Sequence, residues 1–106
     1  MTYLDSVRHK YADRRRYRRY SVDCPARLSF VGGERIGSLS DLSESGARFE
    51  TEKPPVEGAT GMLAWADQHH RCTVIWASAG RCGIRFDRPI GLALVERFVV
   101  KDPARP

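Results

Sequence analysis

Short segments in which apolar and polar residues alternate fill the middle of the chain, and they limit its fold more than any other feature. In the first, A-R-L-S-F-V from Ala26 to Val31, small or apolar residues alternate with polar ones, as in a strand with one buried face. Gly32-Gly33 follows as a hairpin turn signal, and a second strand is expected over about residues 34–39. The folded part of the chain is therefore predicted to begin with a β-hairpin.

Four more strands are expected after this hairpin. A-R-F-E alternates again, whereas K-P-P-V-E-G, from Lys53 to Gly58, cannot continue a strand because proline lacks the backbone donor. T-G-M-L-A-W-A and R-C-T-V-I-W-A-S, separated by D-Q-H-H, form a second predicted hairpin. A turn at Ala79-Gly80 leads to the last strand, R-C-G-I-R-F. Six short strands with regular turns predict an all-β fold, a closed antiparallel barrel.

A helix of about three turns is expected after Pro89, because apolar residues then recur at three- and four-residue spacing. These residues are Ile90, Leu92, Leu94, Val95, Phe98 and Val99. At 106 residues the chain has the size of a single domain. We expect a flexible basic arm over residues 1–20, a barrel with the C-terminal helix over residues 21–100, and a tail over residues 101–106.

The N-terminal arm is strongly basic. Seven arginines and lysines lie between Arg8 and Arg19, and the net charge of the chain is +5. Of the 18 basic residues 15 are arginine, which favours bidentate recognition of phosphates, carboxylates or guanine edges. An anionic partner is therefore expected. Taken alone, the arm also fits a solvated tail or a nucleic-acid patch in which its tyrosines stack on bases.

Several other classes of protein have little support. No apolar run approaches 18 residues and the start does not resemble a signal peptide, so we expect a cytoplasmic protein without membrane insertion. Cys24, Cys72 and Cys82 include no C-x-x-C pair and are expected to be buried thiols. No catalytic motif is present, so an enzyme is not expected. His69, His70, Cys72 and Cys82 are potential zinc ligands, but their spacing matches no common zinc pattern and strand alternation puts the two histidines on opposite faces.

Two short motifs suggest what the anionic partner is. R-x-x-x-R occurs twice in the arm, as Arg14 with Arg18 and as Arg15 with Arg19. About 22 residues later comes D-x-S-x-x-G, formed by Asp41, Ser43 and Gly46 in a loop expected between two strands. With V-I-W and G-I-R-F in later strands, this order resembles the PilZ domain over about residues 13–99. PilZ domains are bacterial receptors for cyclic di-GMP.

The resemblance implies a six-stranded antiparallel barrel whose N-terminal arm closes over the nucleotide without catalysis. In the family the second arginine usually precedes an apolar-rich entry into the first strand, here Y-S-V-D-C-P, which favours Arg15 and Arg19 as the pair. Arg14 lies immediately before Arg15. In other members of the family, an arginine at this position accompanies two stacked nucleotides rather than one. The resemblance also implies a separate effector protein in a process such as motility or exopolysaccharide production.

The chemistry of the ligand matches these residue types. Cyclic di-GMP is a dianion with two guanines, and arginine binds either a phosphate or guanine O6 and N7. The Asp41 carboxylate is expected to accept from guanine N1–H and N2–H. Ser43 is expected to donate to a phosphate or to brace Asp41, and Gly46 permits a positive φ and the close approach of backbone N–H groups to the anion. Trp65 and Trp76 are expected in the barrel, and the alternative is that either of them lines the site.

The expected function is therefore binding of cyclic di-GMP, transmitted to a partner protein by ordering of the arm, with no cofactor or metal. Two alternatives remain: a small basic barrel that binds RNA or DNA, and a nucleotide-independent protein adaptor. The sequence leaves the oligomeric state open.

Overall fold

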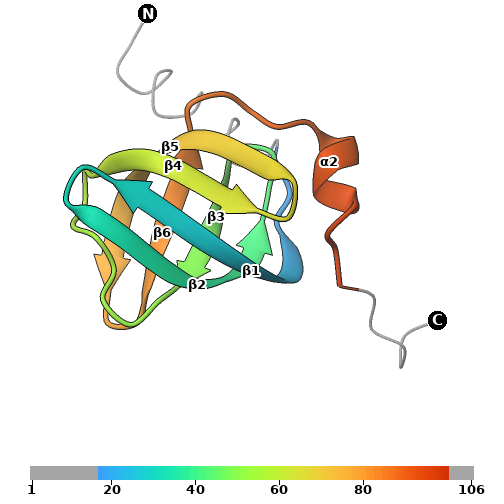
Figure 1. The fold of residues 1–106 in the computed structure, drawn as a ribbon. Coiled ribbons are helices and arrows are strands. Elements are labelled where there is room, and N and C mark those ends of the chain that lie inside the picture. Colours follow the sequence, from blue (N-terminus) through green and yellow to red (C-terminus); the bar gives the residue numbers. More distant parts are fainter. Residues whose placement is uncertain (1–16, 101–106) are drawn as a thin grey trace, which may run out of the picture.

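A computed structural model describes residues 17–100 of the chain. Its six strands form a closed antiparallel barrel in the order β1-β2-β3-β6-β5-β4, and one short helix follows β6 (Figure 1). The elements are β1 (Tyr20–Phe30), β2 (Gly33–Leu42), β3 (Gly46–Glu50), β4 (Thr60–Trp65), β5 (Gln68–Ser78), β6 (Arg81–Phe86) and α2 (Leu92–Glu96). The barrel closes because β1 pairs with β2 on one side and with β4 on the other. The all-β, six-stranded prediction is confirmed.

The barrel interior is filled by the apolar members of the alternating segments. Leu28, Leu39, Phe49, Leu63 and Ile84, from five different strands, are all at most 2% exposed. Successive side chains of a strand point to opposite faces, so the polar members of the same segments lie on the outer surface. The binding residues must therefore be sought on the outside of the barrel or at its ends.

Two strands extend further than expected, and both extensions matter for the site. β1 begins at Tyr20 rather than near Ala26, and β2 continues to Leu42 rather than ending at about Leu39. Each extension lies beyond a β-bulge, where the pairing register shifts and the simple alternation is interrupted. Asp41 therefore belongs to a strand, and the connection from β2 to β3 is shorter than predicted.

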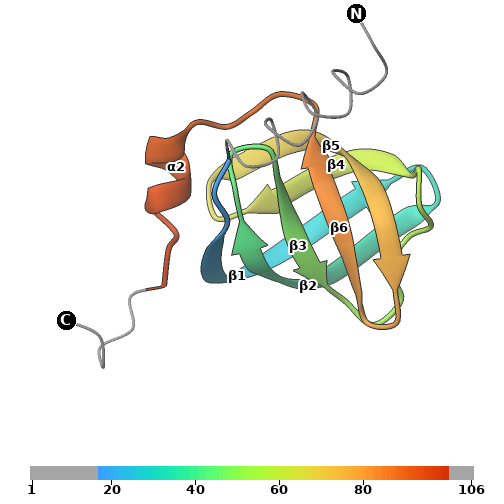
Figure 2. The ribbon, with the colours of Figure 1, turned by 180° about the vertical axis from the view of Figure 1, so that it is seen from behind.

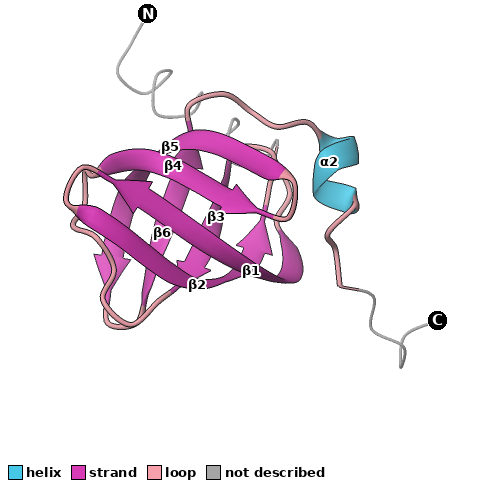
Figure 3. Cartoon of the chain, in the orientation of Figure 1, coloured by secondary structure: helices cyan, strands magenta, loops and turns pink. Residues whose placement is uncertain are grey.

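The C-terminal helix is much shorter than the three turns expected, so that prediction is wrong in length. Of residues 89–100, Leu92–Glu96 are helical, as Figure 3 shows. Pro89 and Gly91, whose φ is 84°, delay its start. The chain then becomes extended, because Val99 forms an antiparallel bridge with Val22 of β1. Pairing with the strand thus overrides the helical spacing of the apolar residues.

The C-terminal segment covers one end of the barrel, beside the start of β1 (Figure 2). Phe98 packs edge-on against Trp65 with ring centroids 5.9 Å apart, and Trp65 also stacks on Phe86 at 5.9 Å. His70 lies 5.2 Å from Trp65 and 5.6 Å from Phe86. Within the described part of the chain, no helix has the length and apolar character that crossing a membrane requires.

His70 is half-buried in this aromatic cluster and should make stability depend on pH. Burial, together with the charge of neighbouring His69, lowers the pKa of His70 below its usual 6.5. At pH values between 6.5 and the lower pKa of His70 in the folded chain, the unfolded chain binds a proton at His70 that the folded chain does not. The free energy of unfolding should therefore fall as the pH decreases below about 6.5.

A His70→Gln variant should lose part of this decrease, measured by urea unfolding at pH 7.5 and pH 5.5. His69→Gln provides the matched control, because His69 is exposed on the same strand. It should keep most of the decrease, since burial is the larger cause of the lowered pKa of His70. If the stability of His70→Gln depends on pH as that of the wild type does, His70 is not the cause of the decrease.

Candidate functional site

Asp41 lies near the end of β2 on the outer face of the barrel, between two arginines. Its Oδ2 is 3.5 Å from Arg19 Nη1 and 3.6 Å from Arg48 Nη2. The Asp41 side chain is only 15% exposed, whereas that of Arg19 is 56% exposed. Asp41 pairs with Ser21 of β1 on one side and with Arg48 of β3 on the other. Two of the predicted site residues, Arg19 and Asp41, are therefore adjacent.

This cluster contains two buried polar atoms that lack hydrogen-bond partners among residues 17–100. They are Asp41 Oδ1, an acceptor, and Arg48 Nε, a donor. An unpaired buried polar group costs about 1–3 kcal/mol relative to a paired one. A ligand that offers a donor to the carboxylate and an acceptor to the guanidinium would recover this free energy.

Arg48 was missed by the sequence analysis, although the sequence contains a signal for it. A short connection between β2 and β3 places Leu42 opposite Ala47 and, one step further, Asp41 opposite Arg48. Counting pairs outward from the turn would therefore have found the arginine. Arg14 and Arg15 lie outside the described residues.

Ser43 is buried, and its hydroxyl holds the turn between β2 and β3 together. Ser43 Oγ accepts hydrogen bonds from the backbone N–H groups of Ser45, at 3.2 Å, and of Gly46, at 3.1 Å. The Ser43 N–H donates to the Gly46 carbonyl at 2.8 Å. Ser43 thus braces its own turn, and the described residues show no hydrogen bond from it to Asp41.

Gly46 is required for close packing, and it does not use the positive φ that a glycine permits. The glycines with positive φ in the described chain are Gly33, Gly58, Gly80 and Gly91. A Cβ on Gly46 would lie 2.1 Å from the backbone oxygen of Ile84 in β6. The absence of a side chain therefore lets β3 approach β6. The Gly46 N–H is already bonded to Ser43, so it does not point to an anion.

A hollow of about 600 Å³ lies next to the turn and to Arg19. This volume is within the usual range for small-molecule sites. Its lining residues are Tyr17, Arg19, Ser43, Ser45, Gly46, Ile75, Trp76, Ile84 and Arg85. They come from the arm, the turn, β5 and β6, and they combine cations, hydroxyls and an indole. The hollow therefore offers both charge and an apolar surface.

Trp76 reaches this hollow because of a β-bulge in β5. The register of β5 with β6 shifts between Val74 and Trp76, so that Val74 faces the core while Trp76 pairs with Gly83. A Cβ on Gly83 would lie 2.0 Å from Trp76 Nε1, which shows that the indole lies directly over the glycine. Trp65, in contrast, is a core residue and is 2% exposed.

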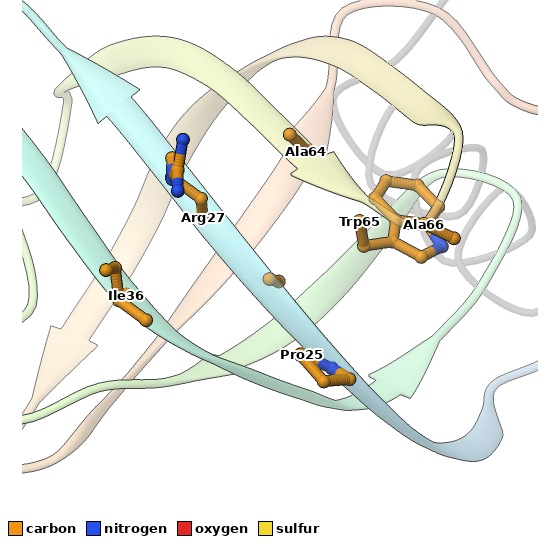
Figure 4. Close-up of a pocket in the computed structure, with 7 residues that line it drawn as sticks. Pro25, Arg27, Ile36, Ala64, Trp65 and Ala66 are labelled. Atoms are coloured by element: carbon orange, nitrogen blue, oxygen red, sulfur yellow. The ribbon is translucent and has the colours of Figure 1, made fainter.

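A second hollow, of about 290 Å³, lies on another part of the outer surface, over β1, β2 and β4 (Figure 4). Figure 4 shows Pro25 and Arg27 of β1, Ile36 of β2 and Ala64 of β4 around it. Its one charged lining residue, Arg27, lies 3.6 Å from Glu34. This shallow, mostly apolar surface is less suited to an anion than the hollow beside Arg19.

The cysteines and histidines do not form a metal site in the described part of the chain. No group of three or more potential metal ligands gathers among residues 17–100. Burial raises the pKa of Cys72 to about 12 and that of Cys82 to about 11, which disfavours the thiolate that a metal requires. Cys24 is only half-buried, so the prediction of three buried thiols holds for two.

Comparison with protein families gives one match. The family model described as PilZ domain matches residues 13–100, which is most of the chain. A comparison with curated proteins finds no match. The matched region contains the barrel, the short helix and the cluster around Asp41.

Proposed function

The chain belongs to the PilZ domain family, whose members are cyclic di-GMP receptors, and from this premise we propose that it binds cyclic di-GMP at the cluster around Asp41. Arg15 and Arg19 would bind phosphate and guanine. Asp41 would accept from a guanine edge, and the turn from Ser43 to Gly46 would shape the pocket. As a binding domain it would act on a separate effector protein rather than catalyse a reaction.

One observation carries this proposal: Asp41 Oδ1 is buried without a hydrogen-bond partner among the described residues. Guanine offers two adjacent donors, N1–H and N2–H, to a carboxylate. Adenine does not have two adjacent donors on that edge. Pairing would satisfy Oδ1 while Arg48 stays at Oδ2. The unpaired oxygen supports the proposal that Asp41 selects guanine.

Charge and stacking support the same ligand. Arg19 is exposed and lines the hollow, so its guanidinium can turn from Asp41 toward a phosphate or a guanine O6 and N7 edge. The Trp76 indole offers an apolar face on which a base can stack. Arg48 holds Asp41 from the opposite side and acts as a positioning residue.

Signal transmission is proposed to occur through the arm. Seven basic residues between Arg8 and Arg19 repel one another, and a bound dianion would neutralise part of that repulsion. The arm would then become ordered over the hollow, and the new surface would be recognised by the effector.

Calorimetric titration with cyclic di-GMP tests the binding directly. We expect saturable binding, with one nucleotide per chain, or two if Arg14 supports a stacked pair. In the same complex, amide hydrogen exchange in residues 8–20 should slow, because the arm becomes ordered. Cyclic di-AMP is the matched control ligand and should bind much more weakly.

Absence of binding would overturn the proposed function. Binding with unchanged hydrogen exchange in residues 8–20 would overturn the arm mechanism alone.

A further inference from the structure

Arg85 occupies the end of the hollow next to the turn between β2 and β3. It lies on the outer face of β6, is exposed, and pairs with Gly46 across the β3–β6 ladder. The next residue, Phe86, donates its backbone N–H to the Ser45 carbonyl at 2.8 Å. The backbone of Arg85 is therefore held firmly beside the turn.

The turn itself has few backbone donors left for an anion. The N–H groups of Ser45 and Gly46 both bond to Ser43 Oγ, and the N–H of Ser43 bonds to the Gly46 carbonyl. Positive charge at this end of the hollow must therefore come from a side chain. Two cations line the hollow, Arg19 and Arg85, and Arg85 is the one whose strand position pairs with Gly46 of the turn.

Arg85 also differs from the other two arginines in its partners. Arg19 and Arg48 both lie within 4 Å of the Asp41 carboxylate. Arg85 forms no ion pair with a carboxylate of the described chain. Among residues 17–100, no carboxylate pairs with its guanidinium that an external anion would have to displace.

The pairing of β3 with β6 sets the distance between Arg48, in the cluster around Asp41, and Arg85. Arg48 of β3 pairs with Gly83 of β6. Gly46, two residues before Arg48, pairs with Arg85, two residues after Gly83. One such step is about 6.6 Å along the strand, and adjacent strands are about 4.8 Å apart. Arg48 and Arg85 are thus diagonal neighbours whose backbones lie roughly 8 Å apart. A ligand that reaches Asp41 with one part can contact Arg85 with another.

Resting on the proposed function, we infer that Arg85 binds the phosphate of cyclic di-GMP that Arg19 does not reach. Cyclic di-GMP carries two phosphates on opposite sides of its ring, so a single cation cluster at Asp41 leaves one of them uncompensated. Arg85 supplies the second charge and favours the cyclic dinucleotide over ligands with one phosphate.

Arg85→Gln tests this inference, with Arg81→Gln as the matched control. Arg81 is exposed on the same face of β6, four residues away, and does not line the hollow. Loss of a charge-assisted phosphate contact should lower the affinity of Arg85→Gln for cyclic di-GMP by about 10- to 100-fold at low salt. The loss should shrink at high salt, and Arg81→Gln should bind nearly as the wild type does.

Phosphorus NMR of the bound ligand adds a readout that a general loss of charge would not produce. Arg85→Gln should shift the signal of one phosphorus and leave at least one other in place. An affinity equal to that of the wild type, or an equal loss in Arg81→Gln, would overturn the inference and leave the proposed function intact. Absence of binding by the wild-type protein would instead overturn the proposed function, and the inference with it.

Discussion

An Arg19→Ala variant should bind cyclic di-GMP about 100-fold more weakly than the wild-type protein, because charge-assisted hydrogen bonds contribute about 1.5–3 kcal/mol each. Arg19 is the described member of the favoured arginine pair, and its guanidinium lies beside both Asp41 and the hollow. The side chain is more than half exposed, so the thermal unfolding midpoint should change little. Calorimetric titration and thermal unfolding of the same preparation would measure both effects.

Arg18→Ala is the matched control, because it makes the same change one residue away. Arg18 is exposed and lies over the Tyr20 ring, 5.4 Å from its centroid, rather than beside Asp41. Its replacement should alter the affinity only slightly. A larger loss in Arg18→Ala than in Arg19→Ala would show that Arg14 and Arg18 are the functional pair.

An Asp41→Asn variant should lose both affinity and base selectivity, although the substitution preserves the shape of the side chain. The guanidiniums of Arg19 and Arg48 would bind the amide oxygen, so that the amide NH₂ would face the guanine donors. Two donors then oppose each other where the wild type pairs an acceptor with a donor. We expect at least a 100-fold loss of affinity for cyclic di-GMP and a smaller preference over cyclic di-AMP.

Asp23→Asn is the control, because Asp23 is exposed on β1 and carries the same charge. Its affinity should remain close to that of the wild type. The Asp41 variant also separates the proposed function from nucleic-acid binding. Binding of RNA or DNA through the basic arm would survive Asp41→Asn and weaken steeply with added salt. Such behaviour, with unchanged cyclic di-GMP affinity, would contradict the role of Asp41.

The number and type of the strands could be predicted because alternation is a local signal. Each alternating segment carries its buried face in its own residues, as in Leu28 of β1 or Ile84 of β6. The ends of the strands were less predictable. Bulges interrupt the alternation before Asp41 and before Trp76, and a bulge forms only where a neighbouring strand is already in place.

The candidate site was predictable in part for the same reason. Asp41, Ser43 and Gly46 were recognised from their spacing, but that spacing does not predict the contacts that two of them make within the barrel. Ser43 braces the turn, and Gly46 makes room for β6, whose position no local pattern specifies. Arg48 comes beside Asp41, and Trp76 comes beside Gly83 at the hollow, only through cross-strand pairing.

By itself, the sequence determined which residues face the core, where the chain turns, and which motif residues carry charge and acceptors. These properties depend on neighbours within a few positions along the chain. Only the tertiary structure decided that Arg19, Asp41 and Arg48 meet, that Trp76 lies over Gly83, and that Val99 ends the helix by pairing with Val22. These contacts depend on ladder register and barrel closure. Both are set by the packing of strands that are distant in the sequence.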